Sequence, residues 1–403
     1  MPNQALSDIR VIDLTHYIAG PVCTKLLADY GADVIKVERP GTGDGARSMG
    51  PFYHDEPHPE KSGLFLSLNT NKRGITLNLK SKLGKEILQE MVKKADVVVE
   101  NFKPGVMERL GLSYADLETV NPKLVMTSIS NFGQTGPYRD YLLTELMAFG
   151  MGGTMHSIGH PGREPQKYGL TVSIYHSGAV AAMATMIGFY GSRYQDTGQH
   201  IDISIMETQA TSVDRRFYAL LTYQYTGTVT PKGASFGAGY PQGTYPCADG
   251  YFRISASGPR FPRAVELMGN PQELMDPRWY ALEAQTDPLL KEEFEAIFLG
   301  FLLQHTKAEL FEMGQRAGNI CAPVYTIEEV CQDPQFNGRG FFAEVEHPVT
   351  GKTKLPGRPF VMEKTPWQLR RPAPMLGQHN QEVYSELGYT QQDLVKLRET
   401  GVI

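Results

Sequence analysis

Short apolar runs alternate with helical patterns along the first half of this chain. The runs that have the character of buried strands are 9–14, 32–38, 74–79, 96–100, 124–129 and 199–205. Between them, 22–30 and 82–95 show the apolar spacing of helices. Strand, helix and strand within about thirty residues form a right-handed βαβ unit. The pattern therefore predicts an α/β domain that is doubly wound around a parallel sheet.

Ligands of doubly wound folds collect beyond the carboxyl ends of the strands. In this sequence those positions hold His16, Arg39, Asn101-Phe102 and Asn131-Phe132-Gly133. No GxGxxG motif follows the first strand, and GxxxxGK[ST] and GxSxG motifs are absent. The sequence thus does not indicate a nicotinamide enzyme, a nucleoside triphosphatase or an α/β-hydrolase.

The pattern changes from about residue 206 onward. The stretch 206–225 is helical and aromatic, which predicts a linker helix. After it, 243–247 and 250–255 alternate like the two strands of a hairpin. Helical patterns follow near 260–269 and 289–303, so a smaller α+β domain is expected here. A chain of 403 residues is too long for one core, which agrees with two domains.

Composition excludes several classes of partner. The formal net charge of −5 gives no reason to expect nucleic acid or an anionic membrane surface. The first residues do not form a signal peptide, and no run of about 18 apolar residues predicts a membrane span. The four cysteines form no CxxC pair, so we expect reduced thiols in the cytoplasm. His156 and His160 are separated by Gly159, which interrupts helical spacing, and no metal site is expected.

One stretch, 167–178, has the character of a loop that leads into a helix of small residues. Such a junction can direct one reactive side chain at a ligand. The position best placed to do so holds Ile174, and 167–194 contains no aspartate or glutamate. Isoleucine has no lone pair with which to form and release an acyl bond.

Several motifs together resemble those of class III CoA-transferases. This family includes formyl-CoA, carnitine and benzylsuccinate CoA-transferases and the 2-methylacyl-CoA racemases. The matching segments are Ala19-Gly20-Pro21, 26–40, Gly43-Asp44 with Arg47, 69–79, 100–105, 130–137 and 198–204. They extend over essentially the whole chain.

The resemblance implies a Rossmann-like large domain built from both ends of the chain, with a small α+β domain between them. The predicted boundaries are 1–205 for the first part of the large domain, 206–225 for the linker helix, 226–330 for the small domain and 331–403 for the return to the large domain. Two chains of this family interlock as a dimer. A CoA thioester is the substrate, and no tightly bound cofactor is implied.

The same resemblance implies an aspartate nucleophile that attacks the thioester and forms a mixed anhydride. The family places it four residues before the glycine that corresponds to Gly178, which is the position of Ile174. Racemases use an aspartate at the same position. Weak candidates for a substitute are Ser173, with His176 as its base, and Glu145, which resembles a glutamate near the formyl-CoA transferase site. His176 is equally interpreted as a residue that caps or packs at the helix start.

We therefore expect a degenerate site and a partner that supplies the missing group. The benzylsuccinate CoA-transferases of anaerobic toluene breakdown pair two related but different chains. The prediction is a structural, non-nucleophilic subunit of such a heteromer, which moves CoA between succinyl-CoA and (R)-benzylsuccinate. The alternatives are a stand-alone transferase or acyl-CoA racemase with an atypical site, and a CoA-binding protein without catalysis.

The resemblance also implies a set of CoA-contacting residues. They are His16, Arg39, Asn71, Lys72, Arg73, Asn101, Phe102, Arg109 and Arg139. Cations and aromatic flanks suit a ligand that carries phosphates and an adenine. For Arg39, Lys72 and Arg73 the alternative is a solvated surface charge. The alternative for Asn101-Phe102 is that they form an ordinary turn. The alternative for His16 is a histidine above the sheet whose hydrogen bonds are made within the protein.

Overall fold

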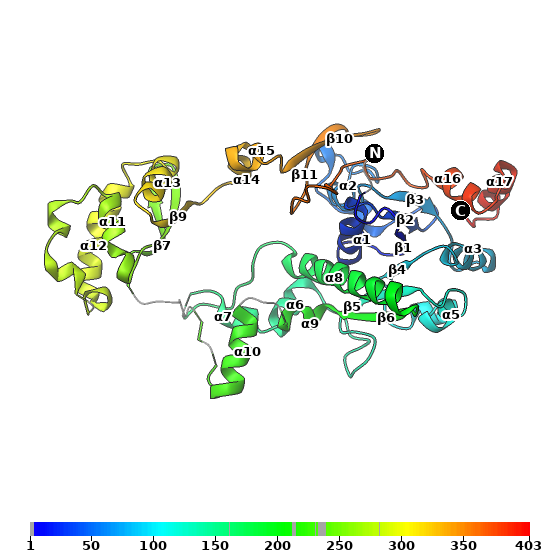
Figure 1. The fold of residues 1–403 in the computed structure, drawn as a ribbon, viewed down its shortest axis with the longest axis horizontal. Helices are drawn as coiled ribbons and strands as arrows, with labels where there is room; N and C mark the ends of the chain where they lie inside the picture. The colour runs from blue at the N-terminus through cyan, green and yellow to red at the C-terminus, as the bar shows by residue number, and fades with distance from the viewer. Residues whose placement is uncertain (1–3, 161, 212–214, 230, 233–238, 282) are drawn as a thin grey trace. The chain divides into compact units, whose positions relative to one another are not determined.

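The protein is described by a computed structural model that covers residues 4–160, 162–211, 215–229, 231–232, 239–281 and 283–403. The chain divides into two compact units (Figure 1). The larger unit combines residues 1–233 with 340–403, and the smaller unit contains residues 234–339. Each unit has its own core, so the two are described separately.

The large unit is built around a parallel sheet, which has six strands among the described residues. The strands are β1 (Arg10–Asp13), β2 (Asp33–Glu38), β3 (Arg73–Thr76), β4 (Val97–Glu100), β5 (Val125–Ser130) and β6 (Gln199–Ser204). Their order in the sheet is β3-β2-β1-β4-β5-β6, and neighbouring strands pair in parallel register. The strand order reverses between β1 and β4, which is where ligands of such sheets bind. The predicted mixed α/β fold with a parallel sheet is confirmed.

Successive residues of each strand point to opposite faces of the sheet and pack against two separate layers of helices. Val11 and Val99 contribute to a core with α1 (Ala19–Asp29) and α8 (Val172–Gln195). Ile12 and Val98 contribute to the core on the other face of the sheet. The helices of that second layer are α3 (Lys82–Val92), α16 (Asn380–Glu386) and α17 (Gln391–Glu399). Because both faces are covered, the strands are apolar throughout, as the sequence pattern indicated.

Helix α8 begins earlier than the sequence predicted. Its first residue is Val172, so Ile174 lies in the first turn of the helix and not on the loop before it. Helix α8 packs against α1 (Figure 1). Gly178 lies inside α8, at the contact with α1. A Cβ atom at Gly178 would lie 2.5 Å from the carbonyl oxygen of Ala19 and 2.7 Å from Val22 Cβ. The glycine therefore permits close contact between two helices and does not mark a helix start.

Shorter helices connect these elements in the large unit. They are α2 (Gly63–Leu68), α4 (Val106–Leu110), α5 (Tyr114–Glu118), α6 (Glu145–Met151), α7 (Thr154–Ser157), α9 (Ile205–Ala210) and α10 (Arg215–Thr226). The linker helix predicted for 206–225 corresponds to α9 and α10, and residues 212–214 between them lie outside the described part.

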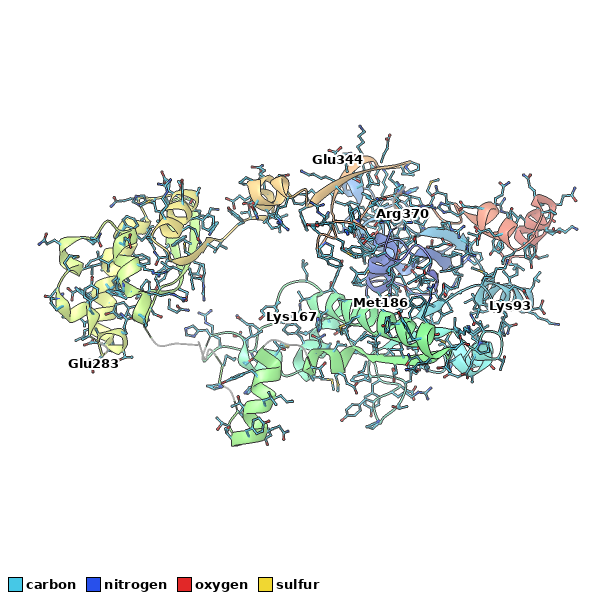
Figure 2. The ribbon with its side chains drawn as sticks, viewed as in Figure 1. Lys93, Lys167, Met186, Glu283, Glu344 and Arg370 are labelled. Atoms are coloured by element: carbon cyan, nitrogen blue, oxygen red, sulfur yellow. The ribbon has the colours of Figure 1, made fainter. Side chains whose placement is uncertain are left out.

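Residues 340–403 return to the large unit. They begin with a hairpin of β10 (Phe342–His347) and β11 (Gly351–Pro356). Further on, Arg370 closes over the end of α1, where its Nη2 donates to the carbonyl oxygen of Ala28 at 2.6 Å (Figure 2). The backbone N–H of Arg370 also donates to Asn71 Oδ1 at 2.6 Å. Both ends of the chain thus contribute to one core.

The small unit is an antiparallel sheet with helices around it. Its strands are β7 (Gln242–Cys247), β8 (Gly250–Ser255) and β9 (Ile320–Pro323), in the order β7-β8-β9. Its helices are α11 (Phe261–Leu267), α12 (Pro288–Leu302), α13 (Lys307–Arg316), α14 (Ile327–Gln332) and α15 (Pro334–Gly338). Phe252, Phe261, Trp279 and Phe294 form the centre of its core. The predicted hairpin is present, and β9 adds a third strand that the sequence did not indicate.

Candidate active site

Two pockets open beyond the carboxyl ends of the strands in the large unit. The first, which we call the β1–β2 pocket, has a volume of about 730 Å³. It is lined chiefly by His16, Tyr17, Arg39, Thr42, Asp44, Gly45, Arg47, His58, Asn101 and Phe102. The second, the α8 pocket, has a volume of about 770 Å³. Its lining includes Tyr17, Ile18, Asn101, Phe102, Lys103, Arg109, Ile129, Ser130, Arg139, Glu145, Ile174 and Ile205.

Hydrogen bonds fix the loops between the pockets. Asn101 clamps the loop that follows β1, because its Oδ1 accepts the N–H of His16 and its Nδ2 donates to the carbonyl oxygen of His16, both at 2.8 Å. Asp44 accepts the backbone N–H groups of Tyr17 and Ala46, each at 2.9 Å. These bonds join the ends of β1 and β4 to the segment after β2. The pockets are therefore shaped by backbone that the sheet holds in place.

Asp44 is held as an anion inside the protein. Lys36 Nζ lies 2.8 Å from Asp44 Oδ2 and donates to the carbonyl oxygen of Thr15 at 2.9 Å. Burial by itself raises the pKa of Asp44, but the Lys36 ammonium and the donors around it outweigh burial and hold the pKa well below its usual range. The charge of Asp44 thus orders the pocket wall and is not available as a nucleophile.

The α8 pocket has a cationic side. Lys103, Arg109 and Arg139 line it, and both guanidinium groups lie close to Gly105. A Cβ atom at Gly105 would lie 3.1 Å from Arg109 Nη1 and 3.5 Å from Arg139 Nη2. Arg139 Nε and Ser130 Oγ are buried, and neither has a hydrogen-bond partner in the described part of the chain. Two unpaired polar groups beside three cations suit a ligand that carries oxyanions.

The opposite side of the α8 pocket is the first turn of α8. Ile174 forms part of the wall and packs against Ile18 and Val22 of the α1 region. The carboxylate of Glu145 accepts the backbone N–H groups of Ser173 at 3.1 Å and Ile174 at 3.2 Å. The Ser173 hydroxyl also donates to it. Glu145 therefore caps α8 from another helix, since Thr171 at the N-cap position makes no side-chain cap bond.

The two other candidates near Ile174 are not among the residues that line the pocket. Ser173 is 1% exposed, does not line the pocket and has its hydroxyl bonded to Glu145. His176 is half-buried on α8 and does not line the pocket either. The geometry therefore gives neither residue access to a thioester in this cavity.

The predicted CoA-contacting residues separate into two groups. His16, Arg39, Asn101 and Phe102 line the β1–β2 pocket. Asn101 and Phe102 also line the α8 pocket, as do Arg109 and Arg139. The structure thus brings together six of the nine residues. Their contact with CoA stays a prediction.

The other three residues, Asn71, Lys72 and Arg73, are buried and line neither pocket, contrary to the expectation. Lys72 Nζ donates to Asp13 Oδ2 at 3.0 Å and Thr24 Oγ1 at 2.8 Å, and burial lowers the pKa of Lys72 to about 8. Asp33 and Glu382 pair with Arg73. The reason is that these side chains bond to the elements around the start of β3 and are turned into the protein interior.

Tyr17, Lys103 and Ser130 are pocket residues that sequence reasoning did not name. Tyr17 and Lys103 each follow a predicted strand end within a few residues, which was the available signal. No group of three or more His, Cys, Asp or Glu side chains in the described ranges is arranged to hold a metal ion. The cysteines are free thiols, of which Cys331 is exposed.

A family model confirms the resemblance that the motifs indicated. The model described as CoA-transferase family III matches residues 6–380. The chain belongs to this family. Proteins that are similar to it include the succinyl-CoA–D-citramalate CoA-transferase of Chloroflexus aurantiacus, with 33% identity over 100% of this chain and 99% of the relative. The formyl-CoA:oxalate CoA-transferase of Bradyrhizobium diazoefficiens is 32% identical, over 100% and 98% of the two chains.

A solved structure has the same fold. A CAIB/BAIF family protein from Brucella suis superposes with a TM-score of 0.84 at 29% identity, and the match covers 96% of this chain and 100% of that one. In the described residues, α8 is the one helix that is long and apolar enough to cross a membrane. One side of it packs on α1 and on the sheet.

Proposed function

We propose that this chain is the non-nucleophilic subunit of a heteromeric CoA-transferase. The single observation behind the proposal is Ile174, which occupies the wall of the α8 pocket where family III is expected to carry its aspartate. A related chain in the same complex supplies that carboxylate. This chain serves to support its partner and to bind the CoA thioester.

The chemistry of the α8 pocket supports a nucleophile on the partner chain and none on this chain. Glu145 and Asp140 are the carboxylates among its lining residues. Both oxygens of Glu145 already accept hydrogen bonds from the start of α8. Asp140 is exposed to solvent. An attacking carboxylate requires a free oxygen directed at the thioester carbon, and Glu145 offers none without uncapping the helix.

An apolar stripe on α8 supports a protein partner. Met183, Ile187, Tyr190 and Tyr194 are between 60% and 73% exposed and follow one another at helical spacing. Exposed apolar patches of this kind mark protein interfaces. We propose that the related chain covers this stripe in an interlocked dimer or tetramer, as a soluble complex of the cytoplasm.

The proposed substrates are succinyl-CoA and (R)-benzylsuccinate. The relatives named above act, by their names, on succinyl-CoA with D-citramalate and on formyl-CoA with oxalate. Both acids are dicarboxylates, as (R)-benzylsuccinate is. In the α8 pocket, Ile129, Ile174 and Ile205 offer an apolar surface for a phenyl ring, and Arg109 and Arg139 offer charge for a carboxylate.

Native purification followed by mass analysis of the intact complex tests the proposal. We expect a second chain of the same family in the complex. After incubation with succinyl-CoA, borohydride trapping is expected to modify a carboxylate on that partner and none on this chain. If this chain purified alone transfers CoA at the rate of the native preparation, the subunit proposal fails.

A stand-alone enzyme that uses Glu145 is the second candidate, because Glu145 lines the pocket beside Ile174. The same trapping experiment separates the two. In that case the modified residue is Glu145, and Glu145→Gln abolishes both trapping and transfer by the isolated chain. In the subunit model the isolated chain shows no transfer to abolish.

A further inference from the structure

Glu100, the last residue of β4, is a buried carboxyl group next to the pockets. It is 3% exposed and lines neither of them. Its Oε2 accepts the backbone N–H of Phe102 at 2.7 Å. Asn101 and Phe102 line both pockets. Glu100 therefore holds a shared part of the pocket walls and does not itself face a ligand.

A chain of hydrogen bonds connects Glu100 to solvent. The hydroxyl of Ser128 in β5 bonds to the Glu100 carboxyl group, and its Oγ lies 2.8 Å from Nε2 of His200 in β6. Ser128 is 1% exposed, whereas His200 is exposed to solvent. A hydroxyl group both donates and accepts, so Ser128 can bond to its two neighbours in either direction.

This chain has two complete arrangements of protons. When Glu100 is ionised, Ser128 donates to the carboxylate and accepts from the Nε2–H of His200. When Glu100 is protonated, its O–H donates to Ser128, which then donates to the Nε2 lone pair. Both arrangements use a neutral His200, and burial of part of that ring lowers its pKa. Glu100 can thus gain or lose a proton while each bond of the chain is kept.

The surroundings of Glu100 place its ionisation near neutral pH. Burial is the main cause that raises the pKa of Glu100 to about 7, and the carboxylates of Glu108 in α4 and Asp202 in β6 act in the same direction. The bonds from Ser128 and the Phe102 N–H act against it. The ionised fraction of Glu100 therefore increases as the pH rises through about 7.

Two further titratable side chains lie around this chain of bonds. Tyr114 of α5 stacks on His200 with 5.6 Å between the ring centroids, and burial raises the pKa of Tyr114 above its usual value. His16, in the loop after β1, lies 5.9 Å from the Phe102 ring. Tyr114 is thus uncharged near pH 7, and any charge on His16 is common to all the variants compared below.

We propose that Glu100 is a positioning residue whose carboxylate fixes the Phe102 N–H, so that CoA binding by this chain strengthens as Glu100 ionises. This inference rests on the proposed function, since it requires a CoA ligand. A hydrogen bond to an ionised acceptor is about twice as strong as one to a neutral acceptor. A wall that is fixed before the ligand arrives also costs less to order on binding. The ionised form is therefore the one prepared for the ligand.

The test measures CoA affinity of the full-length chain at pH 6, 7 and 8 by isothermal titration calorimetry. CoA has a phosphate that itself titrates near pH 6, so each variant is compared with the wild type at the same pH. Glu100→Gln keeps the shape of the protonated acid and cannot ionise. We expect it to bind CoA about fivefold more weakly than the wild type at pH 8 and within about twofold at pH 6.

Two other variants complete the test. Ser128→Ala keeps Glu100 and removes a donor to its carboxylate, so the midpoint of the pH dependence is expected at higher pH than in the wild type. This variant tests the inference even if Glu100→Gln fails to fold. Glu86→Gln is the matched control, because Glu86 is an exposed glutamate of α3, and it is expected to bind CoA like the wild type at each pH.

Three results overturn the inference while the proposed function stands. Equal weakening by Glu100→Gln at pH 6 and pH 8 assigns Glu100 to the fold. Stronger binding by Glu100→Gln at pH 8 shows that repulsion between the carboxylate and the CoA phosphates dominates. An unchanged midpoint in Ser128→Ala contradicts the chain of bonds. If the wild type binds no CoA at any pH, the assigned role in thioester binding fails, and the inference fails with it. The wild-type titration therefore separates the two failures.

Discussion

The capping of α8 by Glu145 gives the sharpest prediction about this site. Glu145 belongs to α6, yet its carboxylate accepts from the first turn of α8 through Ser173 N, Ile174 N and the Ser173 hydroxyl. Glu145→Ala removes these acceptors and leaves the backbone donors in a partly closed pocket. We expect the first turn of α8 to open more easily, because Thr171 at its N-cap position makes no side-chain cap bond.

The magnitude follows from the contacts. Loss of an N-cap acceptor costs about 1 kcal/mol, and a carboxylate near a helix N-terminus adds about 0.3–1 kcal/mol through the dipole. We therefore expect Glu145→Ala to lower the local opening free energy of this turn by about 2 kcal/mol. Glu145→Gln keeps an oxygen acceptor and loses the charge, so about half of that effect is expected.

Hydrogen–deuterium exchange with mass spectrometry measures the effect directly. A change of about 1.4 kcal/mol in opening free energy changes the exchange rate tenfold. Exchange of the Ser173 and Ile174 amides is therefore expected to be about thirtyfold faster in Glu145→Ala. Glu207→Ala serves as the control, because Glu207 is an exposed glutamate in the first turn of α9. The control is expected to leave exchange in α8 unchanged.

Unchanged protection of these two amides in Glu145→Ala would refute the capping argument. It would show that the carboxylate is free to leave the helix, which would restore Glu145 as a nucleophile candidate. An acceleration that appears equally in the small unit would indicate global destabilisation instead. The peptide-level measurement distinguishes the two, since the small unit has a separate core.

Three further results are expected. Ile174→Asp by itself does not restore CoA transfer in a chromatographic assay, because position 174 packs against Ile18 and Val22, which disfavours an ionised carboxylate. Measurable turnover above an Ile174→Asn control would contradict this. In chemical unfolding, Gly178→Ala is expected to destabilise the large unit by about 1–3 kcal/mol, because the new methyl group would collide with Ala19. The control Gly191→Ala, in the same helix, is expected to stabilise the unit by about 0.5–1 kcal/mol. Equal effects of the two substitutions would refute the close packing at Gly178. Burial raises the pKa of Glu100 from 4.5 to about 7, so between these values the folded chain retains a proton that the unfolded chain releases. The free energy of unfolding is therefore expected to fall as the pH rises from 5 to 8, by at most about 3 kcal/mol. Glu100→Gln is expected to remove that slope in urea titrations, and an identical slope would assign it to other groups.

The pattern of apolar residues along the chain, together with general rules of α/β topology, predicted the strands and the parallel sheet. Valine- and isoleucine-rich runs such as that of β4 identify strands that are buried on both faces. Right-handed crossovers then restrict how such strands are arranged. The same ordering predicts that residues after β1, β2 and β4 meet at one edge, and His16, Arg39 and Asn101 do line one pocket there.

The sequence by itself also determined the family and the absence of an aspartate at Ile174, since both follow from residue identity in order. Only the tertiary structure decided which charged residues face a ligand. Lys72 and Arg73 differ little from Arg39 in sequence, but their partners Asp13 and Asp33 lie 59 and 40 positions away. The start of α8 was likewise set by Glu145, 28 positions before Ser173. A polar side chain is buried or free according to whether folding brings it a partner, and that information is not local.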